Sequence, residues 1–201
     1  MKSSVEKWRK RATALLTAFW LLAASVIDSR WGEDSPIGLT LLVLGYALTG
    51  VGVIGRVWCL SYIAGHKTAE LVTDGPYSLC RNPLYFFSLL GAVGVGLGSS
   101  TLTFPLLVMV GFGAYYPGVL KSEARRLAEI HGDTFQAYWQ TTPSLLPSLK
   151  HFHESNEQLI HSRAFRRGLF DTFWFFAALA LMHVFAELHH SGQLPAWYVL
   201  P

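Results

Sequence analysis

The sequence predicts an all-α, polytopic integral membrane protein that crosses the bilayer about five times and forms a single domain over residues 1–201. Composition is the first reason, because 51% of the 201 residues are hydrophobic and only 14% are charged, which is too apolar for an ordinary soluble domain. Aromatic residues are the second, since seven Trp and eight Tyr suit a protein with two lipid–water interfaces. The spacing of the apolar runs is the third.

Five apolar runs account for the predicted spans. The first follows a basic N-terminal segment and contains no charged residue, and the second is rich in glycines that would let neighbouring helices approach closely. The third and fourth are separated only by residues 99–101, so we expect a tight helical hairpin of two runs shorter than the ~20 residues of a full span. The fifth opens with aromatic residues. In order, the runs are residues 12–27, 37–57, 84–98, 102–117 and 169–188.

The basic residues predict the orientation of these spans, since Lys and Arg collect in cytoplasmic segments. With the N-terminus in the cytoplasm, every Lys and Arg except Arg30 falls on the cytoplasmic side, and the C-terminus lies on the opposite side. The polar sequence is then concentrated in two cytoplasmic segments, residues 58–83 and 118–168, which hold the expected short helices. Because the predicted hairpin returns the chain to the same face, we expect both segments to build one site.

The first cytoplasmic segment contains a turn followed by the start of a helix. Asp-Gly-Pro at residues 74–76 is a turn signal, and Pro83 suits the first turn of a helix with Asn82 as its N-cap. Arg81 would then lie beside a helix N-terminus, whose free N–H groups suit a carboxylate or a phosphate. Arg81 can add a bidentate contact to the same anion. The alternative is that Arg81 extends to lipid phosphates and Asn82 only caps the helix.

The second cytoplasmic segment opens with helical spacing of apolar residues over residues 120–131. Gly132 closes this helix, and a short helix through Tyr138 is expected to follow. Glu123 lies near the membrane surface, on the side that could face Arg81. The alternative is a surface carboxylate paired with a basic neighbour along the helix, which is worth only ~0.2–0.5 kcal/mol.

Both segments carry motifs of a known family, in the expected order around the predicted hairpin. The first motif is Gly-Pro-Tyr, three residues, then Arg-[His/Asn]-Pro-x-Tyr; the second is a Glu pair followed at fixed distances by Leu, Gly and Tyr. With these motifs, residues 71–147 resemble the isoprenylcysteine carboxyl methyltransferase and phospholipid methyltransferase superfamily of integral membrane enzymes. Asn82 replaces the common His, and Ala124 replaces the second Glu. The matching residues are Gly75, Pro76, Tyr77, Arg81, Asn82, Pro83, Tyr85, Glu123, Leu127, Gly132 and Tyr138.

The resemblance implies S-adenosyl-L-methionine as cofactor and a lipophilic methyl acceptor, either isoprenylcysteine carboxylate-like or phospholipid amine-like, at the cytoplasmic face of the membrane. Arg81 is expected to bind the carboxylate of the cofactor and Glu123 its ammonium group. In-line methyl transfer depends mainly on orientation and exclusion of water. Apart from the resemblance, His66 beside Lys67 is a candidate acid or base, needed only for an acceptor that arrives protonated. The expected cofactor-binding residues are Gly75, Pro76, Tyr77, Arg81, Asn82, Pro83, Tyr85, Glu123 and Tyr138.

Two other classes of protein stay open. Membrane sterol and steroid reductases that use NADPH carry a related motif, but they are generally longer, and no basic cluster for a 2′-phosphate accompanies the motif here. A non-catalytic membrane protein with a methyltransferase-like shape would explain Asn82 and Ala124. A metal site is not expected, because Cys59 and Cys80 lack ligand spacing and the two His pairs are predicted on opposite sides of the membrane. No feature indicates a nucleic-acid partner, and the oligomeric state is left open.

Overall fold

The computed structural model describes residues 20, 22–32, 35–65 and 70–201. The candidate His66 and most of the predicted first span, residues 12–27, lie outside the described residues. Three described helices are long and apolar enough to cross a membrane: α2 (Pro36–Ile63), α5 (Thr103–Thr141) and α6 (Ser162–His190). A fourth apolar helix, α4 (Pro83–Leu97), is shorter. The helical class is confirmed, whereas the count of five spans and their orientation stay predictions.

Helices α2 and α4 pack backbone against backbone because small residues line their contact. A Cβ atom added to Gly52 of α2 would lie 2.5 Å from the backbone N of Gly91, and one added to Gly94 of α4 would lie 2.5 Å from the backbone N of Thr49. No side chain fits at these positions, which is how helices approach closely where water cannot drive their association. Gly45, Gly52 and Gly55 of the second apolar run therefore have the packing role that the sequence indicates, whereas a Cβ atom at Gly50 would meet no atom within 4 Å.

Helix α5 is longer than the sequence predicts. A span over residues 102–117 and a separate helix over residues 120–131 were expected, but α5 continues through Pro117 without interruption. The φ of proline suits a helix, and in an apolar environment a helix keeps nearly all backbone groups hydrogen-bonded. The break expected at Gly132 is confirmed, because this residue has a φ of +50° and divides α5 into two helical parts.

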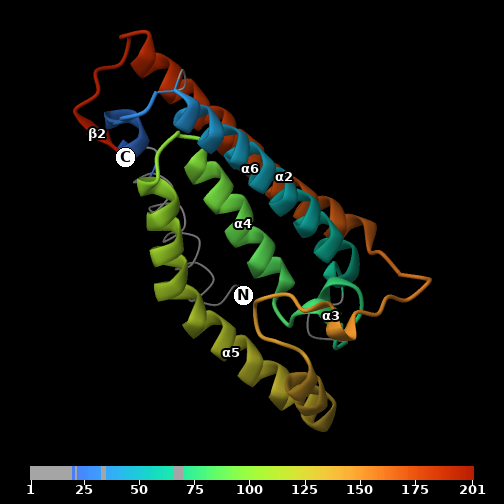
Figure 1. The fold of residues 1–201 in the computed structure, drawn as a ribbon. Coiled ribbons are helices and arrows are strands. Elements are labelled where there is room, and N and C mark those ends of the chain that lie inside the picture. The colour runs from blue at the N-terminus through green and yellow to red at the C-terminus, as the bar shows by residue number, and fades with distance from the viewer. Residues whose placement is uncertain (1–19, 21, 33–34, 66–69) are drawn as a thin grey trace, which may run out of the picture.

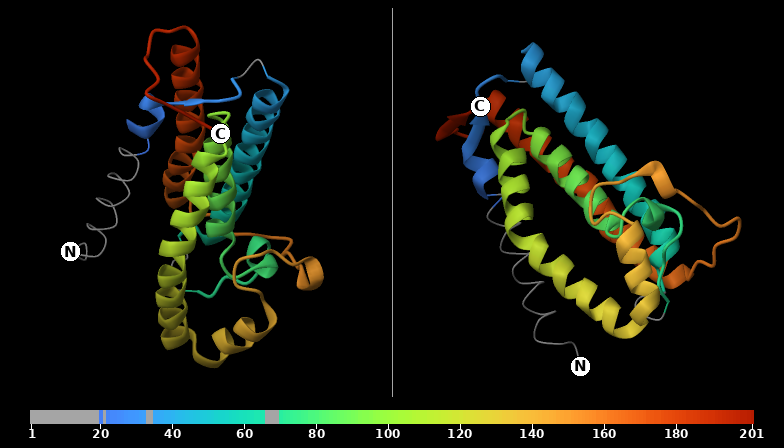
Figure 2. Two further views of the ribbon diagram at one scale, coloured as in Figure 1. Left: turned by 60° about the vertical axis from the view of Figure 1, so that its left-hand side comes forward. Right: turned by 60° about the horizontal axis from the view of Figure 1, so that its bottom comes forward.

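Helix α4 is the centre of the bundle. It packs against α2 and α6 on one side and against α5 on the other, as Figures 1 and 2 show. A buried cluster of Val95, Phe104, Leu179 and Met182 joins α4, α5 and α6. Two three-residue strands, β1 (Ile27–Ser29) and β2 (Tyr198–Leu200), pair in parallel beside the turn between α4 and α5. No pattern in the sequence predicts these strands.

The opposite end of the bundle holds both motifs. Here α2 ends, the short helix α3 (Pro76–Leu79) follows, and α4 begins; we call this the motif end. The chain after α5 folds back across α3 through the short helix η1 (Leu149–His151) before it enters α6 (Figure 1). The N–H of Ser148 donates to the carbonyl of Leu79 at 2.9 Å, so this returning chain fixes the loop that carries the first motif.

Candidate active site

A sharp turn at Gly75 opens the first motif. Its φ of +57° lies in the left-handed region, and a Cβ atom at this position would overlap the ring of Tyr62. The N–H of Gly75 donates to the carbonyl of His153 at 2.9 Å. Pro76 then starts α3, where a residue without an N–H is well suited. Gly75 and Pro76 together direct the chain so that Tyr77 enters the interior.

The two motifs meet at Tyr77 and Tyr138. The hydroxyl of Tyr138, near the end of α5, donates to the backbone carbonyl of Tyr77 at 2.7 Å, and both side chains are buried. The hydroxyl of Tyr77 has no hydrogen-bond partner among the described residues. Burial raises the pKa of Tyr77 well above its usual value. Tyr77 is therefore a neutral phenol at physiological pH that can donate a hydrogen bond to a ligand.

Arg81 is held from two sides. Its backbone N–H donates to the carbonyl of Pro143 at 2.8 Å, and its guanidinium carbon lies 3.4 Å from the centre of the Trp139 ring. Stacking on an indole is a favoured geometry for guanidinium. The Nε and Nη1 atoms are buried and have no partner among the described residues. Burial lowers the pKa of Arg81, but an arginine still carries its charge at neutral pH.

Asn82 stands at the N-cap position of α4 but does not cap the helix with its side chain. Instead its Nδ2 donates to the carbonyl of Ser144 at 2.8 Å. The expected side-chain cap is wrong because the chain after α5 passes beside the start of α4 and offers this carbonyl. Pro83 follows as the buried first residue of α4, so its predicted place at the helix start is confirmed.

Glu123 borders the first turn of α4 from the side of α5. Its Oε2 accepts a hydrogen bond from the hydroxyl of Tyr85 at 3.1 Å, and its side chain is exposed. The Tyr85 ring packs edge-on against Tyr116, with ring centres 5.1 Å apart. Among the described residues, Glu123 and Arg81 form no ion pair with each other. Both ionisable groups therefore border the start of α4, and neither neutralises the other by direct contact.

Buried polar atoms without partners gather near the motif end. The described residues include six with such side-chain atoms, and four of the six lie in this part of the bundle or on the adjoining part of α5. Such atoms are rare in folded proteins and need an explanation, such as a ligand. The sequence motifs predict only two of the four, Tyr77 and Arg81, as site residues. The four are Arg56, Tyr77, Arg81 and His131.

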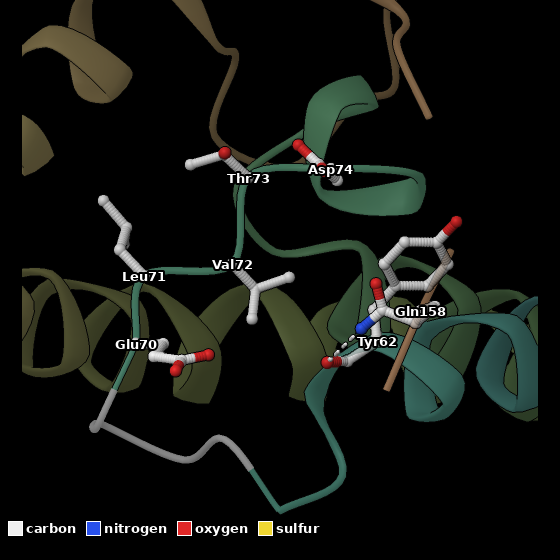
Figure 3. Close-up of a pocket in the computed structure, with 7 residues that line it drawn as sticks. All are labelled: Tyr62, Glu70, Leu71, Val72, Thr73, Asp74 and Gln158. Carbon is white, nitrogen blue, oxygen red and sulfur yellow. Dashed lines mark hydrogen bonds between the residues drawn. The ribbon is translucent and has the colours of Figure 1, made fainter. Parts of the chain in front are cut away.

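A cavity of about 190 Å³ lies beside the loop that leads into the first motif. Figure 3 shows the loop from Glu70 to Asp74, which lines the cavity together with the neighbouring side chains of Tyr62 and Gln158. The cavity is smaller than the ~300 Å³ of typical ligand pockets, and neither Arg81 nor Glu123 lines it. The motif side chains, rather than this cavity, define the candidate site. In the described part of the chain, no three His, Cys, Asp or Glu residues are grouped as a metal site would require.

Comparisons with known proteins agree with the motifs. The phospholipid methyltransferase family matches residues 36–134, which extend from the start of α2 past the break at Gly132. The nickel-cobalt-cadmium resistance protein NccN of Alcaligenes xylosoxydans xylosoxydans is 33% identical over 90% of this chain and 88% of its own. The cobalt-zinc-cadmium resistance protein CzcN of Cupriavidus metallidurans is 36% identical over 94% of this chain and 84% of its own. No solved structure matches. The chain therefore belongs to the phospholipid methyltransferase family, within the membrane methyltransferase superfamily that its two motifs indicate.

Proposed function

We propose that the protein is an S-adenosyl-L-methionine-dependent membrane methyltransferase that methylates a lipophilic acceptor at the motif end of the bundle. Family membership supports the reaction class. The observation that carries the cofactor assignment is the guanidinium of Arg81, whose Nε and Nη1 atoms are buried without partners among the described residues. A buried cation with unused donors is a suitable partner for a carboxylate.

The residues around Arg81 fit the three chemical parts of this cofactor. Arg81 would hold the carboxylate and Glu123 the ammonium group, which matches the charges available on the two sides of the α4 start. Trp139 and Tyr85 would offer aromatic surface to the adenine. The stacking of Arg81 on Trp139 also fixes the guanidinium in place before any ligand enters, which lowers the entropic cost of binding.

The protein contributes orientation and exclusion of water in this proposal. When bound, the cofactor supplies a methyl group on a sulfonium, an electrophile that needs no covalent enzyme nucleophile. Tyr77 and Tyr138 lock the first motif to α5 and thereby set the distance between the cofactor residues and the helical bundle. Tyr77 cannot serve as a base near neutral pH, because burial raises its pKa. An acceptor that arrives protonated would need another base, for which His66 is our candidate.

The acceptor is proposed to enter from the bilayer. Helices α2, α5 and α6 expose apolar side chains along lengths that suit a membrane, and a lipophilic acceptor dissolved there can reach the site laterally. This favours amphiphiles, such as a prenylated thiol carboxylate or a phosphatidylethanolamine, over small water-soluble acceptors.

A role in metal tolerance is a second proposal, carried by the two relatives that are named for resistance to cobalt, cadmium and other metals. In our proposal, such a role would depend on methyl transfer. Cells that carry Glu123→Gln should then tolerate cobalt no better than cells without the protein. Equal tolerance of cells carrying the wild type and Glu123→Gln would contradict this link.

The methyltransferase proposal is tested by incubating the protein in lipid nanodiscs with a bacterial lipid extract and methyl-labelled S-adenosyl-L-methionine. Label should enter the lipid fraction and be resolved there by mass. Glu123→Gln should reduce the rate by about tenfold or more, since a charge-assisted contact is lost. The control Glu129→Gln, an exposed carboxylate on the same helix, should leave it unchanged. Label found only in small water-soluble products would refute the lipophilic acceptor, and no transfer to any fraction would refute the enzyme.

A further inference from the structure

Arg56 is a charged residue inside the apolar helix α2, outside both motifs. The sequence suggested that the second span ends near Arg56, but α2 continues to Ile63. At a rise of ~1.5 Å per residue, Arg56 lies roughly 10 Å before the end of the helix. A charge at this depth in a membrane helix is costly and is usually retained for function.

The surroundings of Arg56 satisfy only part of its guanidinium. Nη1 donates to the hydroxyl of Ser88 on α4, and the guanidinium carbon lies 5.4 Å from the centre of the Phe175 ring on α6. The Nε atom is buried and has no partner among the described residues. No described Asp or Glu forms an ion pair with Arg56, and Asp171 on α6 is an acidic residue among its electrostatic neighbours. Its charge is therefore not neutralised by direct contact within the described chain.

The position of Arg56 connects it to the candidate active site. Cys59 follows it by three residues on the same face of α2, and Cys59 belongs to the same buried cluster as Tyr77. Tyr77 and Tyr116 are among the electrostatic neighbours of Arg56. The hydroxyl of Tyr77, like the Nε of Arg56, is buried without a partner among the described residues. The Nε of Arg56, which is cationic, and the hydroxyl of Tyr77 are therefore two hydrogen-bond donors without described partners near the place where α2 meets α3 and α4.

We propose that Arg56 and the hydroxyl of Tyr77 form a subsite for an oxyanion of the methyl acceptor, either a carboxylate or a phosphate on a lipophilic chain. The inference rests on the proposed function and narrows its substrate class. A guanidinium and a phenol both donate to anionic oxygen, and the acceptor would offset the charge that the helix bundle leaves unpaired. Arg56 lies deeper in α2 than the motif loop, so the anion of a bilayer-derived acceptor would be held on the membrane side of the cofactor residues.

The test measures binding of three amphiphiles with the same chain, dodecanoate, dodecyl phosphate and neutral dodecanamide, to the full-length protein in phosphatidylcholine nanodiscs by calorimetry. Arg56→Gln should weaken binding of the anion by about tenfold or more, because a charged hydrogen bond is lost, and should leave the amide within twofold. Tyr77→Phe removes a hydroxyl without a partner, so the fold should tolerate it, and anion binding should weaken several-fold. Ser88→Ala is the control that removes a neighbour of Arg56 but keeps the charge, and it should change anion affinity less than threefold. Whichever anion binds the wild type more tightly is the oxyanion that the subsite prefers.

Unchanged anion affinity in both Arg56→Gln and Tyr77→Phe would overturn the subsite, and so would an equal loss for the neutral amide. If Arg56→Gln does not fold, Arg56→Lys and Tyr77→Phe decide: lysine should retain part of the anion affinity, and unchanged binding in Tyr77→Phe overturns the proposal. Wild-type binding of S-adenosylhomocysteine is measured in the same nanodiscs. Its absence would mark failure of the proposed function, whereas its presence together with unchanged anion binding would mark failure of the subsite alone.

Discussion

The close contact between α2 and α4 makes one substitution especially informative, Gly94→Ala. A Cβ atom at this position would lie 2.5 Å from the backbone N and 2.6 Å from the Oγ1 of Thr49, and 2.7 Å from the backbone O of Gly45. Two of these three atoms belong to the backbone of α2, so a change of rotamer cannot relieve the overlap. The helices must separate by a large fraction of an ångström.

The cost follows from that geometry. Overpacking of this kind destabilises a protein by ~1–3 kcal/mol, and for a chain of this size each kcal/mol shifts the melting temperature by about 2–4 °C. Gly94→Ala should therefore lower the midpoint of thermal unfolding in detergent by roughly 2–12 °C. Because Arg81 lies just before α4 and Tyr85 in its first turn, affinity for S-adenosylhomocysteine should fall with it.

Gly111→Ala on α5 is the matched control. The same substitution there meets no atom within 4 Å, and alanine favours a helix over glycine by up to ~1 kcal/mol. Gly111→Ala should leave the midpoint unchanged or raise it slightly. Equal midpoints for the two variants would refute the packing of α2 on α4 described above.

Three further predictions concern the site. Arg81→Lys keeps the charge but loses the planar stacking and the fork of donors, so affinity for S-adenosylhomocysteine should fall about tenfold. The control Arg125→Lys, on the exposed part of α5, should bind S-adenosylhomocysteine normally. Equal affinities of the two variants would exclude Arg81 from the site. Tyr138→Phe leaves the buried carbonyl of Tyr77 without its donor, so denaturant titration should show a loss of ~1–3 kcal/mol, and an unchanged midpoint would contradict this contact. Burial raises the pKa of Cys80 to about 11, so at pH 8 only about one thiol in a thousand is ionised. Maleimide should therefore label Cys80 only after denaturation or as the pH approaches 11. Rapid labelling of Cys80 in the native protein at pH 8 would show that the thiol is accessible and would contradict this prediction.

Local chemistry and periodicity were enough to predict much of the bundle. The expected run over residues 84–98 corresponds to α4, because Pro83 and the polar turn after Leu97 mark its two ends. Gly132 breaks α5 where the sequence indicates, since it adopts a positive φ. The continuation of α5 through Pro117 could not be predicted from propensity, because the φ of proline suits a helix and an apolar environment favours keeping the remaining backbone groups hydrogen-bonded. The pairing of β1 with β2 depends on contacts between the two distant ends of the chain, which no local pattern encodes.

The candidate site divides in the same way. The meeting of the two motif segments followed from the order of the helices, and the bond from Tyr138 to Tyr77 is one of their contacts. The partners of individual side chains did not follow from the sequence. Asn82 reaches Ser144 instead of capping α4, because the path of the chain after α5 is a property of the folded molecule. The charge of Arg56 predicts the end of a span there, but α2 continues to Ile63, and the apolar residues after Arg56 are the signal of this continuation.

The central claim is that the motif end binds S-adenosyl-L-methionine, and a titration of the wild-type protein in nanodiscs tests it most directly. S-adenosylhomocysteine and NADPH are each added while heat of binding and the melting temperature are recorded. Micromolar binding of S-adenosylhomocysteine with a raised melting temperature, and no response to NADPH, is the predicted result. Binding of NADPH in preference would favour a reductase, and no response to either ligand would favour a non-catalytic protein; both would contradict the account.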